Sequence, residues 1–151
     1  NLFESKTASL NLTKNDIILA SIVEREAKKD EERAIIAGIY SNRLKQGMKL
    51  DADPTVQFGR DNNLLVAGKT VDKFWGSITV ADYQGVISDY NTYLSVGLPP
   101  GPIANAGLKS LEAAQNPAST TAIFFLHGKD GTLYTAKTLE EHNANKKKFC
   151  W

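Results

Sequence analysis

The sequence has few of the residues from which disulfides and metal sites are built. Cys150 is the single cysteine, so no intrachain disulfide can form. Only two histidines occur, His127 and His142, and no His-Glu-x-x-His spacing is present, which argues against a zinc site. A serine nucleophile elbow, a phosphate-binding loop and a dinucleotide glycine fingerprint are also missing. We therefore expect no metal and no organic cofactor.

The sequence also lacks a strong net charge and a long apolar run. Its formal net charge is +1, which gives no field that would recruit nucleic acid. No apolar run approaches the ~20 residues that cross a bilayer, and no signal peptide is visible. A length of 151 residues with 42% apolar content suits one soluble globular domain, residues 1–151. Because the chain begins at Asn1 and not at Met, we expect it to be part of a longer or processed protein.

The pattern that is present predicts an α+β fold, mainly helical, with a small β-hairpin. Capping residues predict one helix from Thr13 to about Lys29 and a second from Asp30 to Gly47. We expect residues 48–60 to be extended because Asp53 precedes Pro54, and 57–77 to be irregular. The prolines in 90–107 exclude a helix there. The later elements are a helix at 108–115, a hairpin with strands near 122–126 and 133–135, and a helix from Thr138 whose lysines 146–148 form a solvated end.

One carboxylate falls on the apolar face of the first predicted helix. At about 100° per residue, Glu26 lies within the apolar stripe, whereas Glu24 points to the opposite side and toward solvent. Burial tends to raise the pKa of a carboxyl, as a general acid at neutral pH requires. The pattern is equally consistent with a structural salt bridge of Glu26 inside the core.

The second predicted helix repeats this anomaly. Arg43 lies in the middle of its apolar face, and Glu32 shares that face. A buried arginine must donate hydrogen bonds to a carboxylate or a carbonyl, or else line a solvated cleft. From the helix pattern alone, a structural pair with Glu32 or Glu26 is favoured over a substrate contact.

The loop at 90–107 combines tyrosines with a Pro/Gly-rich segment. Tyr90 and Tyr93 precede Pro99-Pro100-Gly101-Pro102, and such a rigid loop can hold backbone groups toward a ligand. A tyrosine ring has an apolar face and a polar tip, which suits sugars. Without other context, a loop that merely covers the core is the better interpretation.

These segments together resemble the MltG-type (YceG-like) endolytic murein transglycosylases. The resemblance extends from about Leu12 to Phe149, with several motifs in the same order. The motifs are Leu19 to Glu26, Glu32-Arg33 with Ile36-Ala37-Gly38, Asn42-Arg43-Leu44, Gly47 to Leu50, Asp53-Pro54-Thr55-Val56, Tyr90 to Tyr93, Gly97 to Asn105 and Glu141-His142-Asn143. Asp51, Ala106 and His127 stand where members of the family usually carry other residues.

The resemblance implies a lysozyme-like (YceG-like) catalytic domain with Glu26 as its single acid/base. Such an enzyme cleaves the MurNAc-GlcNAc β-1,4 bond within glycan strands and uses the sugar's own C6 hydroxyl as nucleophile, which yields 1,6-anhydro-MurNAc ends. The implied substrate-binding residues are Asn42, Arg43, Asp53, Thr55, Tyr90, Asn91, Thr92, Tyr93, Pro100 and Asn105. Two alternatives stay open: a non-catalytic peptidoglycan-binding domain, and a muramidase that hydrolyses the same bond.

The resemblance also implies where such a protein works. Its partners are peptidoglycan glycan strands and not nucleic acid. Family members usually carry an N-terminal membrane anchor and a LysM-like region, and neither lies within these 151 residues. We therefore expect the full-length protein at the outer face of the bacterial cytoplasmic membrane, near cell-wall synthesis enzymes, and this part of it to be soluble.

Overall fold

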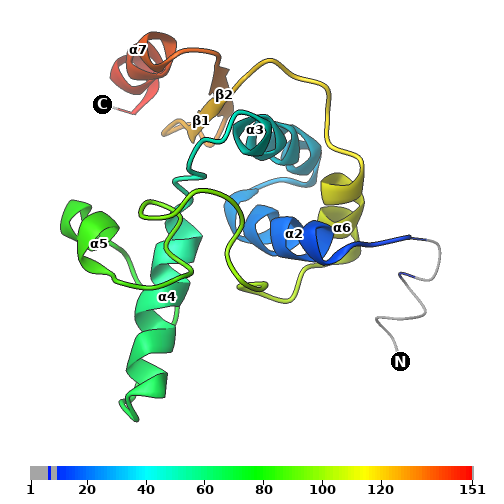
Figure 1. Cartoon of the computed structure of the whole chain (residues 1–151). Coiled ribbons are helices and arrows are strands. Elements are labelled where there is room, and N and C mark those ends of the chain that lie inside the picture. Colours follow the sequence, from blue (N-terminus) through cyan, green and yellow to red (C-terminus); the bar gives the residue numbers. More distant parts are fainter. Residues whose placement is uncertain (1–6, 8–9, 151) are drawn as a thin grey trace.

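The computed structural model describes residue 7 and residues 10–150 and confirms an α+β, mainly helical fold (Figure 1). The elements in chain order are α2 (Lys14–Glu26), the 3-10 helix η1 (Asp30–Glu32), α3 (Arg33–Lys45), α4 (Asp53–Val66), α5 (Val80–Gly85), α6 (Leu108–Gln115), β1 (Phe124–His127), β2 (Leu133–Ala136) and α7 (Leu139–Phe149). None of the helices within the described residues is long and apolar enough to cross a membrane.

The hydrophobic core lies among α2, α3 and α6. Ile22, Ile36 and Leu111, one from each helix, are almost completely buried. The Ser21 hydroxyl, also buried, accepts a hydrogen bond from the Ile103 amide at 3.0 Å, which fastens the 90–107 loop to α2. Burial of large aliphatic side chains contributes about 1.5–3 kcal/mol each, so this three-helix core is the rigid base for the rest of the domain.

The capping residues place most helix ends where the sequence predicts them. Thr13 and Asp16 form a reciprocal capping box at the start of α2, and Thr138 caps α7. Gly47 follows α3 with a φ of 66°, the left-handed conformation that glycine adopts readily. The first helix is shorter than expected: it ends at Glu26 and not near Lys29, because the next residues turn into η1.

The prediction of an extended segment at 48–60 is wrong from Asp53 onward, whereas residues 48–52 are not helical and Lys49 forms an isolated β-bridge with Val96. Residues Asp53–Val66 form α4, so the irregular segment predicted at 57–77 is also wrong over 57–66. Pro54 lies in the first turn of α4, where its missing N–H costs no intrahelical hydrogen bond. A proline in such a segment can therefore lie in the first turn of a helix. Asp53 is the first residue of this helix.

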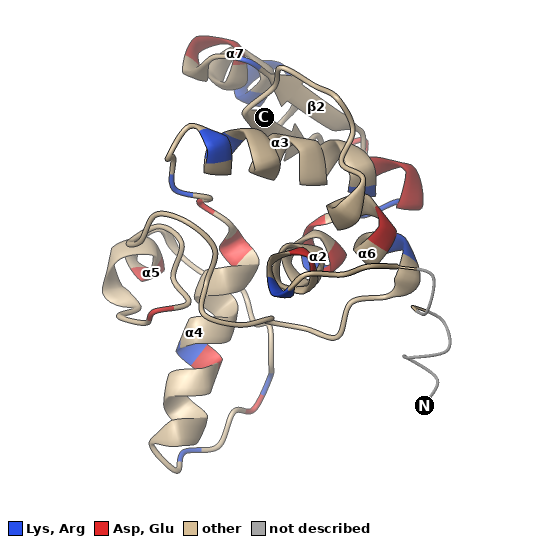
Figure 2. Ribbon diagram, turned by 45° about the vertical axis from the view of Figure 1, so that its right-hand side comes forward, with Lys and Arg blue, Asp and Glu red and all other residues tan. Residues whose placement is uncertain are grey.

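The hairpin and α7 form a second layer on one side of the core. β1 and β2 pair antiparallel, with Phe124 opposite Ala136 and His127 opposite Leu133. α7 packs against both strands. Figure 1 shows this layer beside α3, while α4 and α5 lie farther from it, in the lower part of the view. Figure 2 shows that the acidic and basic residues are spread over several elements.

Candidate active site

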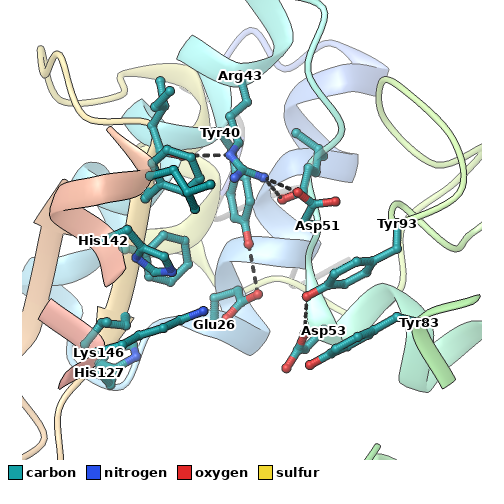
Figure 3. A pocket seen from close by; sticks show the side chains of 16 residues that line it. Glu26, Tyr40, Arg43, Asp51, Asp53, Tyr83, Tyr93, His127, His142 and Lys146 are labelled. Carbon is teal, nitrogen blue, oxygen red and sulfur yellow. Dashed lines mark hydrogen bonds and ion pairs between the residues drawn. The ribbon is translucent and has the colours of Figure 1, made fainter. Parts of the chain in front are cut away.

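A cleft of about 470 Å³ separates the α7–hairpin layer from α4, α5 and the 90–107 loop. Figure 3 shows Glu26 between these two sides. The residues that line the cleft are Glu26, Tyr40, Arg43, Leu50, Asp51, Asp53, Tyr83, Tyr93, Ile123, Phe124, Phe125, Leu126, His127, Leu139, His142 and Lys146. Tyr93 brings the 90–107 loop to the same cleft as Glu26.

Glu26 is the last residue of α2, and its half-buried carboxyl borders the cleft. Tyr40, which is 2% exposed, donates a hydrogen bond from its hydroxyl to Glu26 Oε1 at 2.9 Å. Burial raises the pKa of Glu26 from 4.5 to about 7; the Tyr40 hydrogen bond opposes the rise and the negative charge of Asp53 adds to it. The group can thus both donate and accept a proton near neutral pH.

The salt-bridge interpretation of Glu26 is wrong for the described residues. Its carboxyl has no cation within ion-pair distance there, and the contact it makes is to the neutral Tyr40 hydroxyl. A half-buried carboxyl without a cation is costly when ionised, which is the physical origin of the raised pKa.

Glu24 lies on the opposite side of α2, but it does not simply point to solvent as predicted. Its Oε2 accepts hydrogen bonds from the Ser110 hydroxyl at 2.6 Å and the Gly107 amide at 3.1 Å. It also pairs with Arg33 at 3.2 Å. Helix periodicity predicts the direction of the side chain, whereas Gly107 and Ser110, at the start of α6, reach it from a distant part of the chain.

Arg43 forms part of the cleft wall and is 6% exposed. Its partners are not Glu32 or Glu26, as the helix pattern favoured. Its Nη1 donates to the Leu50 carbonyl at 2.7 Å and to Asp51 Oδ2 at 3.0 Å, and its Nε donates to the Ile123 carbonyl at 2.7 Å. The guanidinium therefore links α3 to the segment before α4 and to Ile123, the residue that precedes β1.

A pair of tyrosines forms the opposite side of the cleft. The rings of Tyr83 and Tyr93 stack with centroids 4.2 Å apart and planes 14° apart. Tyr93 donates its hydroxyl hydrogen bond to Asp53 Oδ1 at 2.7 Å. Burial, followed by this hydrogen bond to Asp53, raises the pKa of Tyr93, so the hydroxyl stays protonated. Figure 3 shows the two rings beside Asp53.

Three of the sequence-predicted residues are buried and support this side instead of lining the cleft. The hydroxyls of Thr55 and Thr92 lie 2.9 Å apart and tie α4 to the loop. The amide of Asn91 donates to the carbonyls of Val86 at 2.8 Å and Tyr83 at 3.1 Å. These contacts fix the positions of Tyr83 and Tyr93.

The remaining predicted residues lie outside the cleft lining. Asn42 donates to the carbonyls of Thr120 and Ala122 at 2.7 and 3.0 Å, which holds the approach to β1. Tyr90 packs against the Phe58 ring, and Tyr90 and Pro100 line a separate cavity of about 670 Å³. Asn105 is exposed and lines neither cavity.

Sequence reasoning missed several residues of the cleft. Tyr83 lies on α5, which was not predicted, although the Thr79–Asp82 capping box was a readable signal for it. His127 contacts Glu32, with Nε2 and Oε2 3.0 Å apart, and lines the cleft. Lys146, interpreted from sequence as part of a solvated helix end, also lines the cleft.

The raised pKa of Glu26 predicts a specific pH dependence of stability. Protonation favours the folded state, so this contribution is complete below pH 4.5 and is lost as the pH rises to about 7. A rise in pKa from 4.5 to about 7 corresponds to at most about 3.5 kcal/mol. Glu26→Gln, which cannot ionise, should therefore be more stable than the parent at about pH 8, with the advantage vanishing at about pH 4. Urea unfolding of both proteins at the two pH values measures this; a difference independent of pH would contradict the raised pKa.

The fold and the cleft define an α+β domain built around one carboxyl that can be protonated near neutral pH. Residues 3–148 match the sequence profile of the YceG-like family, and the chain belongs to that family.

Similarity to two endolytic murein transglycosylases supports the assignment to this family. The chain is 42% identical over 133 residues to the endolytic murein transglycosylase of Bacillus subtilis (strain 168), which covers 88% of this chain and 34% of that protein. It is 33% identical over 147 residues to the endolytic murein transglycosylase of Streptococcus pneumoniae (strain ATCC BAA-255 / R6), covering 96% of this chain and 25% of that protein. The chain thus spans about a quarter to a third of these relatives.

A solved structure shows the same fold. The crystal structure of a yceG-like protein from Listeria monocytogenes superimposes with a TM-score of 0.74 at 36% identity. The match covers 95% of this chain and 43% of that chain.

Proposed function

We propose that this chain is the catalytic part of an endolytic peptidoglycan lytic transglycosylase. The observation that carries the proposal is the Glu26 carboxyl, whose pKa is raised to about 7 in a cleft large enough for sugar residues. The names of the relatives supply the substrate class, murein.

The proposed reaction needs one carboxyl in two successive roles. Protonated Glu26 first donates its proton to the glycosidic oxygen as the bond from C1 of the muramyl sugar breaks. The resulting Glu26 carboxylate then accepts the proton of that sugar's C6 hydroxyl while the C6 oxygen bonds to C1. The product is a 1,6-anhydro end, Glu26 is protonated again, and no water is consumed. Tyr40 positions the carboxyl through its hydrogen bond.

The two sides of the cleft suggest how the glycan is held. The Tyr83–Tyr93 pair offers aromatic surface for a sugar ring, and the Asp51 and Asp53 carboxylates can accept hydrogen bonds from sugar hydroxyls. Arg43 positions Asp51, while Asn42, Thr55, Asn91 and Thr92 act indirectly, by holding the walls. Tyr90, Pro100 and Asn105 could contact only a strand that extends beyond the cleft.

Tyr40→Phe tests the proton-donor role of Glu26. The parent kcat/KM should fall above about pH 7, about tenfold per pH unit, because the protonated carboxyl is lost. The Tyr40 hydrogen bond lowers the pKa of Glu26, so its removal should move this descending limb to higher pH. A pH–rate profile of both proteins measures the shift. A merely structural role for Tyr40 would lower the rate without moving the limb.

A muramidase is the second candidate, because Asp53 supplies another carboxylate in the same cleft. Hydrolytic glycosidases use a second carboxylate as base or nucleophile. Asp53 is held by the Tyr93 hydroxyl, which leaves it able to stabilise positive charge on the sugar ring. Purified glycan strands separate the candidates: we expect internal fragments with anhydro ends, whereas reducing ends would identify a muramidase and uncut strands a binding domain.

We further propose that the whole protein acts in the bacterial cell envelope. Its substrate, peptidoglycan, lies outside the cytoplasmic membrane, and a membrane anchor would keep the cleft close to newly made strands and the enzymes that synthesise them.

A further inference from the structure

One stripe of α7 lines the cleft. Leu139, His142 and Lys146 all line the cleft, and their spacing of three and four residues puts them on one face of the helix. Leu139 is 58% exposed although it is a large apolar side chain. Figure 3 shows His142 and Lys146 on the side of the cleft opposite Tyr83 and Tyr93.

Among the described residues, Lys146 differs from the other basic groups of the cleft because its ammonium has no ion-pair or hydrogen-bond partner. Arg43 is occupied by Asp51 and by carbonyl groups, and His127 is paired with Glu32. Within the described part of the chain, the Lys146 ammonium makes neither an ion pair nor a hydrogen bond. An exposed, unpaired cation that lines a cleft is available to an anionic ligand.

His142 leaves Lys146 as the positive charge of this stripe. The His142 ring stacks on Phe124 with centroids 5.2 Å apart, and its buried Nδ1 has no hydrogen-bond partner within the described residues. Burial, followed by the charges of Lys146 and Arg43, lowers the pKa of His142, so the ring is neutral at neutral pH. The stripe therefore runs from an apolar residue through a neutral ring to a cation.

We propose that this α7 stripe is a subsite for the substituent of the muramyl sugar, in which Lys146 binds a carboxylate. The inference rests on the proposed function, which supplies the substrate class. A muramyl sugar differs from N-acetylglucosamine by a lactyl group, which bears a methyl and a carboxyl. That carboxyl is either free or joined to a peptide stem that bears further carboxylates. A methyl would contact Leu139 and a carboxylate would pair with Lys146.

The position of Glu26 between the two sides agrees with such a subsite. Glu26 lies between the tyrosine side and the α7 side of the cleft (Figure 3). The subsite requires that a sugar ring against Tyr83 and Tyr93 directs its substituent toward α7 and places the bond to be cut over Glu26. The stripe would then distinguish muramyl positions from N-acetylglucosamine positions, and so determine which of the two alternating linkages reaches the acid.

Lys146→Ala tests the subsite, with Lys147→Ala as the matched control. Lys147 is the next residue of α7, is exposed, and does not line the cleft. KM is measured on peptide-bearing strands, on strands stripped of peptides, and on N-acetylglucosamine oligomers. Strand binding is measured in parallel in a Glu26→Gln background. We expect Lys146→Ala to raise KM and the dissociation constant about 3- to 10-fold on anionic strands, with kcat little changed. The effect should shrink at high salt, and Lys147→Ala should match the parent.

The three substrates distinguish a stem carboxylate from the lactyl carboxylate. Together with the binding measurements, they also distinguish a failure of the subsite from a failure of the proposed reaction. An effect confined to peptide-bearing strands assigns the contact to a stem carboxylate, and one that persists on stripped strands assigns it to the lactyl carboxylate. Equal effects of both lysine variants, or an equal effect on N-acetylglucosamine oligomers, would overturn the subsite. Strands that bind to the protein but are never cut would overturn the proposed reaction, while the binding measurements would still decide the role of Lys146.

Discussion

Glu26→Gln should abolish cleavage while the fold and glycan binding persist. Glutamine has nearly the same shape and can still accept the Tyr40 hydrogen bond, but it has no proton to transfer. A general acid typically contributes ~10²–10⁴-fold to the rate, and here one residue is proposed as both acid and base. We therefore expect a loss at the upper end of that range or beyond, measured as the release of anhydro-muropeptides at matched protein concentrations.

Glu24→Gln is the matched control, two residues earlier on the same helix. Its carboxylate contacts Arg33, Gly107 and Ser110 and does not line the cleft. We expect this variant to retain turnover and to lose about 1–3 kcal/mol of stability, the effect of weakening partly buried hydrogen bonds to a charged group. An inactive Glu24→Gln beside an active Glu26→Gln would show that the acid has been assigned to the wrong glutamate.

Arg43→Leu should strongly destabilise the folded domain. The leucine would leave the carbonyls of Lys49, Leu50 and Ile123 without the donors that Arg43 supplies. Unsatisfied buried polar groups cost about 1–3 kcal/mol each, so we expect a loss of about 3–5 kcal/mol in the free energy of unfolding. Urea unfolding of the variant and the parent measures it.

Asp51→Asn controls for the ion pair of Arg43. The Asp51 side chain is 39% exposed, so solvent screens the pair, and its loss should cost less than about 1 kcal/mol. If Arg43→Leu also stayed within that limit, the carbonyl contacts would not hold the wall together and the structural role given to Arg43 would be wrong.

The helices that could be predicted are those whose signals are local. Thr13 and Thr138 have capping side chains within three residues, and the turn at Gly47 needs a left-handed residue. The start of α4 could not be predicted from Pro54, because a proline is compatible both with an extended residue before it and with the first turn of a helix. The structure has the second arrangement, in which the N–H that proline lacks has no intrahelical acceptor to lose.

Part of the site was also predictable, because some of its residues have local sequence signals. Glu26 and Arg43 break the apolar pattern of their own helices, so each could be found from its neighbours in sequence. The partners of Arg43 could not be found, because they are backbone carbonyls brought close by the fold. Lys146 and Tyr83 have ordinary local patterns, and only the tertiary packing shows that they face the same cleft as Glu26.

The most direct measurement is mass spectrometry of glycan strands cut in water labelled with heavy oxygen. We predict muramyl ends that are lighter by one water than the hydrolysis product and contain no heavy oxygen, because the C6 hydroxyl is the nucleophile. The same ends should be absent with Glu26→Gln. Reducing muramyl ends that carry the heavy oxygen would show that water is the nucleophile and would contradict a lytic transglycosylase.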